Sequence, residues 1–246
     1  MPRLLLASAA VVLALAPVSA QESAEAVVKK AIEAHGGADL LKKLVAGESK
    51  YKGEMTVFGM DLEFTARSVY QLPGKFRMEI DTEAGGQKLA IVQIVNGTKT
   101  KNMLNGMATP LGEAEQKELR QAVMIQEITQ LTPLLGDKTY TLKPEKPTDD
   151  ANVVLVTAKD LNDTKLFFDK KTGLLNKIER KGLAPSMGEP TEVTEETVMS
   201  DYKKVDGVMQ PTKVVVNHDG KKFMSMSVTE VKLMEKADEK AFAVDD

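Results

Sequence analysis

Apolar and polar residues alternate with a period of two over three successive segments, which predicts half-buried antiparallel strands. The alternation runs through 51–57, 60–67 and 75–80, and turns that contain Gly or Pro separate these segments. Residues 89–95 form a more continuously apolar run, which is typical of a central strand. This region therefore predicts an antiparallel meander with one apolar and one polar face.

Two other regions have apolar residues at helical spacing. Residues 22–45 carry them on one face, and the pair Gly36-Gly37 ends one helix before a second, shorter helical piece. Residues 113–131 begin with glutamates, which stabilise a helix N-terminus, and keep helical spacing until Pro133. The sequence thus predicts an N-terminal helical region and one long helix inserted into the β meander.

The rest of the chain returns to strand patterns. Asp206-Gly207 and Asp219-Gly220 predict hairpin turns, and Pro211 predicts that a strand begins there or lies at a sheet edge. The total is about ten strands, and the fold class is α+β. The later strands are expected over 139–142, 153–158, 165–168, 174–181, 193–202, 208–217 and 222–234.

A sheet of about ten antiparallel strands does not stay flat, so we expect it to curl with its apolar face inward. The inserted helix would lie in this concavity, either as part of a closed core or as a lid over an apolar pocket. The two alternatives involve the same residues. They are Met55, Val57, Met60, Leu62, Phe64, Phe76, Met78 and Ile80 from the strands, with Leu119, Val123 and Ile128 from the helix.

The first twenty residues have the pattern of a secretory signal peptide. Arg3 precedes an uncharged apolar run from 4 to 16, and Val18-Ser19-Ala20 places small residues at a cleavage site. The apolar run is too short to span a membrane, and no Cys follows Ala20 to be acylated. We expect residues 1–20 to be removed and residues 21–246 to form a single domain that is periplasmic or secreted.

Charge and amino-acid composition reduce the number of possible binding partners. The leader holds one of the 33 basic residues and none of the 36 acidic ones, so the mature chain has 32 minus 36, a net charge of −4. Basic and acidic residues are interspersed, which argues against a nucleic-acid partner. The chain has no Cys and no Trp but 13 Met, and Met side chains suit either an irregular core or an adaptable lining for acyl chains.

Motifs for catalysis are scarce. His35 and His218 lie far apart and outside any metal-binding motif, and neither a G-x-S-x-G elbow nor a phosphate-binding loop occurs. The group Asp160, Asn162 and Asp163 lacks the Gly and the later Glu of an EF-hand loop. We therefore expect no catalytic residues, no metal and no cofactor, and an enzyme is the weakest of the functional hypotheses.

Five segments of the chain match one family: AIEAHGG at 31–37, LLKKL at 40–44, LTPLL at 131–135, FFDKKTGLL at 167–175 and DYKKVDGVMQP at 201–211. In these segments the chain resembles the bacterial lipoprotein-localisation carrier superfamily, and within it the planctomycete-type outer-membrane lipoprotein-sorting proteins. The resemblance extends over nearly all of residues 24–242.

This resemblance implies an unclosed β-barrel with a helical lid that holds acyl chains in an apolar cavity. The function it implies is that of a periplasmic carrier or chaperone that transports lipoproteins or other lipidated cargo. The partners would be a lipidated protein or lipid acyl chains, with a membrane protein as a further partner. The alternative is a periplasmic sensor or protein-interaction module without lipid transport, because similar folds serve as stress sensors.

Overall fold

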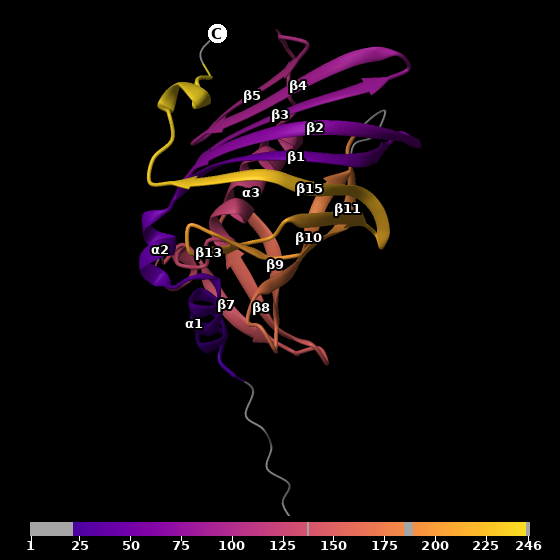
Figure 1. Ribbon diagram of the computed structural model, residues 1–246. Helices are drawn as coiled ribbons and strands as arrows, with labels where there is room; N and C mark the ends of the chain where they lie inside the picture. Colours follow the sequence, from indigo (N-terminus) through magenta and orange to yellow (C-terminus); the bar gives the residue numbers. More distant parts are fainter. Residues whose placement is uncertain (1–21, 137, 185–188, 245–246) are drawn as a thin grey trace, which may run out of the picture.

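The computed structural model describes residues 22–136, 138–184 and 189–244 (Figure 1). The signal peptide expected at 1–20 lies outside these residues. The described chain consists of one large curled antiparallel sheet, a two-stranded hairpin and a few helices on the concave side and at one end of the sheet.

The large sheet has thirteen strands in the order β6-β5-β4-β3-β2-β1-β15-β14-β11-β10-β9-β8-β7. Its two end strands, β6 and β7, do not pair with each other, so the described sheet is an open, unclosed barrel, as expected. The bounds are β1 (Ala46–Val57), β2 (Met60–Gln71), β3 (Lys75–Ala84), β4 (Gln87–Asn96), β5 (Lys99–Leu104), β6 (Met107–Ala108), β7 (Thr141–Glu145), β8 (Ala151–Ala158), β9 (Leu161–Asp169), β10 (Leu175–Ala184), β11 (Thr191–Ser200), β14 (Lys213–His218) and β15 (Lys221–Met234).

The described strands outnumber the expected ten because β5, β6 and the short strand over 203–205 were not predicted and because one expected strand is divided. β5 and β6 were not predicted, because the polar residues of Lys99–Leu104 hide the alternation of a strand near the edge of the sheet. The expected strand 208–217 is interrupted at Pro211, which separates β13 (Val208–Gln210) from β14. β13 pairs with β12 (Lys203–Val205) in the separate hairpin. The run 89–95 forms most of β4, third from one edge rather than central in the sheet.

The N-terminal helices follow the sequence pattern closely. α1 (Ala24–His35) begins at Ser23, whose hydroxyl accepts a hydrogen bond from the Ala26 amide. The helix ends at Gly36, whose φ of 130° is open to glycine and strained for other residues. The short α2 (Ala38–Lys43) follows at once.

The inserted helical region is divided in two. α3 (Glu113–Ile128) is followed by a turn in which Leu131 has a φ of +62°, and then by the single turn of α4 (Pro133–Gly136). α3 contacts β4 and β5 on one side of the curled sheet and β9 and β10 on the other. The helix therefore crosses the concave side of the sheet, behind β1 and β15 in Figure 1.

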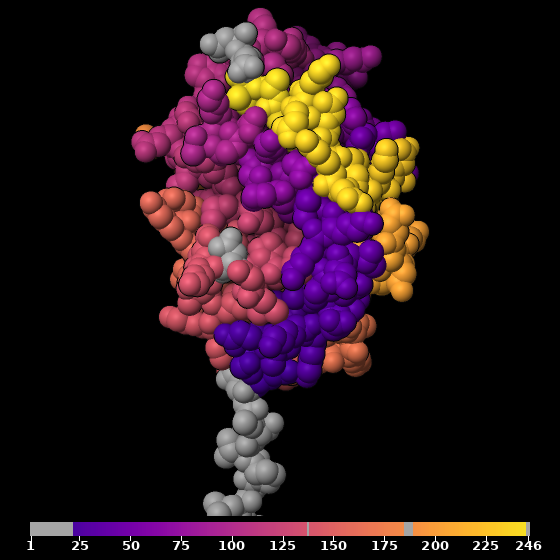
Figure 2. Space-filling model, turned by 90° about the vertical axis from the view of Figure 1, so that its left-hand side faces the viewer, coloured from indigo at the N-terminus to yellow at the C-terminus, as the bar shows by residue number. Residues whose placement is uncertain are grey.

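The main hydrophobic core lies at the end of the sheet where α1, α2 and α4 meet β8–β10. Figure 2 shows the N-terminal helices in indigo beside the segment that contains α4. A second, smaller core forms where the C-terminal 3-10 helix η1 (Glu239–Phe242) packs on β3 and β4. There, Phe242 is completely buried and clusters with Ala46 and Val69, so the C-terminal segment covers part of the outer face of this half of the sheet.

Candidate functional site

A cavity of about 260 Å³ lies between α3 and the concave face of the sheet. It is more enclosed than two other hollows of the protein, one on the outer face of the sheet and one on the other flank of α3. Its wall is built from both halves of the sheet, from α1, α2 and α3, and from the β13 segment. The lining residues are His35, Leu41, Ser49, Tyr51, Ser68, Tyr70, Phe76, Met78, Ala122, Ile125, Gln126, Thr129, Gln130, Leu175, Ile178, Thr197, Met199, Tyr202, Val208, Met209, Gln210, Pro211, Val214, Met226, Val228, Val231 and Leu233.

The strand register shows how the predicted lining residues relate to this cavity. Phe76 and Met78 lie in its wall, opposite Tyr70 and Ser68 on β2. The other six predicted strand residues share that face of the sheet, because they are separated from lining residues by even steps along their strands. Five of them lie farther along the strands, outside the cavity wall. They are Met55, Val57, Met60, Leu62 and Ile80, all at least partly exposed.

The helix presents a different face to the cavity from the one expected. Its lining residues run from Ala122 to Gln130, whereas Leu119, Val123 and Ile128 are absent from the wall. Val123 is 3% exposed and borders an open hollow of about 840 Å³ on the other flank of α3, together with Val95. Ile128 is completely buried in the main core. The most apolar stripe of α3 therefore anchors the helix, and a mixed stripe faces the cavity.

Hydroxyl and amide groups are grouped on one part of the cavity wall. The hydroxyls of Tyr51 and Ser68 are 3.0 Å apart, and Tyr70 is hydrogen-bonded to the side chain of Gln130. Burial raises the pKa of Tyr70 to about 12. Its ring lies over Gly47, where an added Cβ would stand 2.6 Å from a ring carbon. A glycine at this point of β1 is thus what allows the Tyr70 ring to take its position.

At the opposite end of the cavity, His35 meets Tyr202. The two rings are in edge-to-face contact with centroids 5.9 Å apart, and the Tyr202 hydroxyl donates to the Leu175 carbonyl oxygen. Burial lowers the pKa of His35, and the hydrogen bond between its Nδ1 and the Ala31 carbonyl, 2.8 Å long, offsets this only in part. His35 is therefore neutral at pH 7 and contributes a polar but uncharged group to the wall.

The segments that carried the family resemblance meet at this same end. A Cβ on Gly36 would lie 2.7 Å from the Gly207 carbonyl oxygen, so the end of α1 packs directly on the β12–β13 hairpin. A Cβ on Gly173 would lie 3.1 Å from Ala34 of the same helix. Segments near residues 36, 173 and 207 thus form one packed unit at the end of the cavity, which the sequence alone did not reveal.

A buried ion cluster attaches α3 to the sheet. Arg180 of β10 is 8% exposed, and its Nη2 lies 2.5 Å from Glu118 of α3 and 2.9 Å from Glu195 of β11. Nε2 of His218 is 3.4 Å from the other Glu195 oxygen. One turn along the helix, the buried Gln121 accepts a hydrogen bond from the Asn162 amide at 2.7 Å. These two polar contacts hold the N-terminal half of α3 against β9–β11.

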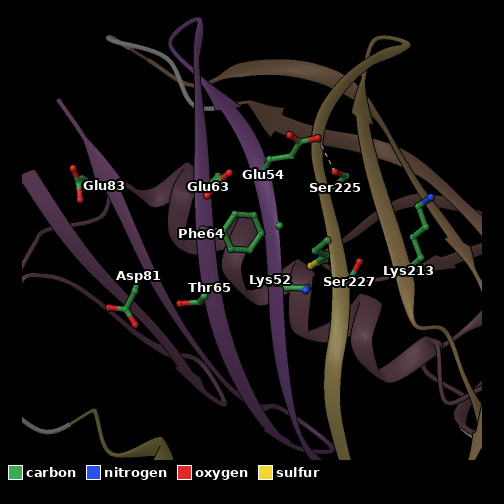
Figure 3. A pocket seen from close by; sticks show the side chains of 12 residues that line it. Lys52, Glu54, Glu63, Phe64, Thr65, Asp81, Glu83, Lys213, Ser225 and Ser227 are labelled. Carbon is green, nitrogen blue, oxygen red and sulfur yellow. Dashed lines mark hydrogen bonds between the residues drawn. The ribbon is translucent and has the colours of Figure 1, made fainter. Parts of the chain in front are cut away.

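A second open hollow, of about 730 Å³, lies on the outer face of the sheet (Figure 3). Its rim is polar, and Glu54 accepts hydrogen bonds from Lys222 at 2.8 Å and from Ser225 at 3.3 Å. Phe64, one of the predicted lining residues, is part of this hollow rather than of the enclosed cavity. Gly53 stands between Phe64 and Met226 in the register, and all three residues border this hollow.

Within residues 22–136, 138–184 and 189–244, no group of three or more His, Asp or Glu side chains is arranged to hold a metal ion. In the same part of the chain, no helix has both the length and the apolar character needed to cross a membrane.

Comparison with known proteins identifies the fold. No family model matches the chain, and no curated protein matches it. A LolA-superfamily protein from Nitrosomonas europaea superimposes with a TM-score of 0.57 at 11% identity, covering 90% of this chain and 98% of the other. A DUF1329-family protein from Desulfovibrio piger gives a TM-score of 0.56 at 12% identity, with coverages of 90% and 97%. An outer-membrane lipoprotein-sorting protein domain from Vibrio parahaemolyticus gives 0.54 at 10% identity, with coverages of 89% and 97%. The chain therefore has the LolA-type fold over nearly its whole length.

Proposed function

We propose that this protein is a periplasmic carrier that binds lipoproteins or other lipidated cargo non-covalently, without chemical conversion of the cargo. The observation that carries the proposal is the cavity of about 260 Å³ enclosed between α3 and the concave face of the sheet. The LolA-type fold supports it, since two of the similar structures are a LolA-superfamily protein and a lipoprotein-sorting domain. The leader-like residues 1–20 support a periplasmic location.

The volume of the cavity determines whether α3 must move for an acyl chain to bind. Ligand pockets for small molecules run to roughly 300–1,000 Å³, so the cavity at about 260 Å³ is just below that range with α3 in place. A complete acyl chain therefore requires α3 to shift outward. The turn after α3, in which Leu131 has a φ of +62°, would serve as the hinge for this movement. The Glu118–Arg180 pair and the hydrogen bond from Asn162 to Gln121 hold the N-terminal half of the helix and would have to break if that half moved as well.

The predicted residues outside the cavity wall extend the same apolar surface. The register places Tyr51, Ala66, Ile80, Ile91 and Leu104 in one row across β1–β5, starting at the cavity wall. A chain longer than the cavity would continue along this row once α3 has moved. Each methylene buried there would contribute roughly 0.8 kcal/mol.

Native mass spectrometry of protein purified from its own periplasm, before and after delipidation, tests the proposal. We expect the native sample to carry bound acylated species and the delipidated sample to bind acylated peptides again. Met78→Trp, which fills the cavity, should abolish rebinding, whereas Thr65→Trp on the exposed outer face of β2 should not. Protein that is empty from the periplasm and fails to bind acylated peptides would refute a carrier function.

A second candidate function is a sensor or interaction module that binds a membrane-protein partner. Large apolar side chains are exposed at the free ends of the β1–β2 and β5–β6 hairpins, with Phe58 at 49%, Met60 at 47% and Met107 at 71%. Such side chains suit a protein contact as well as a lipid. A partner captured equally well by native and by delipidated protein, and lost in Met107→Ser, would favour this function over transport.

A further inference from the structure

The described residues that line the enclosed cavity include no charged side chain. Among its described lining residues there is no Asp, Glu, Lys or Arg, although these four residue types are abundant in the chain. The two other hollows are different. The outer hollow is bordered by Lys52, Glu54 and Asp81, and the hollow on the far flank of α3 by Lys117 and Arg120.

The charged side chains of α3 lie on the sides of the helix that face away from the cavity. Glu113, Lys117, Arg120 and Glu127 of α3 border the far-flank hollow, and Glu118 is paired with Arg180. The cavity receives the uncharged stripe that ends in Gln130. Charged and uncharged side chains therefore lie on different faces of α3, and the uncharged face is turned toward the cavity.

Three titratable groups in the wall, those of His35, Tyr70 and Tyr202, are also neutral at pH 7. His35 is buried and held by the Ala31 carbonyl, and burial lowers its pKa. Tyr70 and Tyr202 have pKa values raised by burial. The buried guanidinium of Arg180 on β10 already contacts two carboxylates and is not part of the wall.

What the wall offers instead is a set of neutral hydrogen-bonding groups. The Tyr51–Ser68 hydroxyl pair, 3.0 Å apart, uses one of its two protons internally and leaves the other available. The side-chain amide of Gln126 and the hydroxyl of Thr129 lie in the wall on the helix side. Hydroxyls and amides of this kind pair with ester and amide groups, whereas a buried carboxylate needs a cationic partner.

We propose that the cavity selects acyl chains with an uncharged ester or amide head and discriminates against the free fatty-acid carboxylate. This inference rests on the proposed carrier function and specifies its ligand class. Lipidated proteins carry their acyl chains through such ester and amide bonds, so free fatty acids would not compete effectively with the cargo.

The test compares dodecanoate with its glycerol monoester as competitors of a neutral fluorescent acyl ester, both below their critical micelle concentrations at neutral pH. The chain is the same, so a difference in affinity reports the head alone. We expect the monoester to bind at least about tenfold more tightly, because the carboxylate would lose its hydration without gaining a cation. Equal affinities would overturn this inference and leave the carrier function intact. Failure of both ligands to bind would refute the carrier function itself.

A cation placed in the wall provides the matched variant. Met78→Lys should reverse the preference toward dodecanoate, and Thr65→Lys on the outer face should leave it unchanged. If Met78→Lys does not fold, as judged by circular dichroism, Gln126→Lys on the helix side serves instead, because that side chain is only partly buried. A folded lysine variant that keeps the wild-type preference would contradict the proposal.

Discussion

The two halves of the sheet use the same alternating pattern for different purposes. In β8–β10 the concave face is covered by α1 and α4, and residues such as Val154 and Leu166 are completely buried. In β1–β5 the corresponding face is covered only in part by α3, and Ile80 and Ile91 stay partly exposed. One half therefore supplies the stable core, and the other supplies an apolar surface that is open to a ligand.

The half with the open concave face is stabilised from its outer side. The C-terminal segment binds there through the Asn96 side chain, which donates to the Phe242 carbonyl oxygen at 3.1 Å, and through the Gln71 side chain, which accepts from the Ala237 amide at 2.9 Å. Phe242 buries Val69 on the face that would otherwise be exposed. Because the C-terminal segment stabilises this half of the sheet from the outer side, the concave face of β1–β5 does not have to be covered by a core.

The strongest test of this comparison is to place a charge in each half. Leu166→Asp puts an unpaired carboxylate into the main core and should cost more than about 4 kcal/mol, enough to prevent folding. Ile80→Asp, on the partly exposed concave face, should cost less than about 2 kcal/mol but weaken acyl-ester binding. Urea melts and ligand titrations measure both effects. Equal destabilisation would mean that the two halves form one core.

The next largest effect should come from the ion cluster that joins α3 to the core half. Arg180→Met leaves Glu118 and Glu195 facing each other without their cation, and breaking such a buried cluster costs roughly 3–5 kcal/mol. The free energy of unfolding in urea gives the value. Glu118→Gln is the control, since it keeps Arg180 paired with Glu195 and should cost clearly less. A loss below that of Glu118→Gln would show that the cluster does not anchor the helix.

A smaller effect is expected where β1 meets β2 in the open half. Gly47→Ala forces the Tyr70 ring to move, because the added Cβ would lie 2.6 Å from it, and overpacking of this kind costs about 1–3 kcal/mol. Gly220→Ala is the control. An added Cβ there would meet no other atom, so the variant measures only the cost of a positive φ, +76°, for a residue other than glycine. Thermal melts should show the larger shift for Gly47→Ala, together with altered ligand affinity.

The smallest effect concerns acid stability. Burial pushes the pKa of Glu195 upward, but the hydrogen bond to His218 and the charge of Arg180 outweigh it and hold the pKa below the ordinary value of 4.5. The stabilisation is therefore present above that value and is lost as the pH falls through the lowered pKa. In urea melts from about pH 5 to about pH 3, His218→Phe should lose less stability than the wild-type protein. An unchanged pH slope would exclude this contribution.

The sequence predicted the meander of β1–β4, α1 and the hairpin turns at Asp206-Gly207 and Asp219-Gly220, because these depend on local periodicity and on glycines with positive φ. It did not predict β5, whose polar residues hide its alternation. It also identified the shared face of Met55 and Phe76 but not the extent of the cavity, which depends on where α3 crosses the sheet. The orientation of α3 was missed because its cavity stripe ends in glutamine and threonine rather than in apolar residues.

Photo-cross-linking with a neutral acyl ester that carries a diazirine at the end of its chain tests the central claim most directly. If the cavity under α3 holds the acyl chain, labelled peptides should come from residues 122–130, in and directly after α3, and from the cavity-facing positions of β2, β3 and β15, among them Ser68, Met78 and Met226. Excess unlabelled monoester should remove the label. Labelling confined to the outer face, around Glu63 and Thr65, would contradict the account.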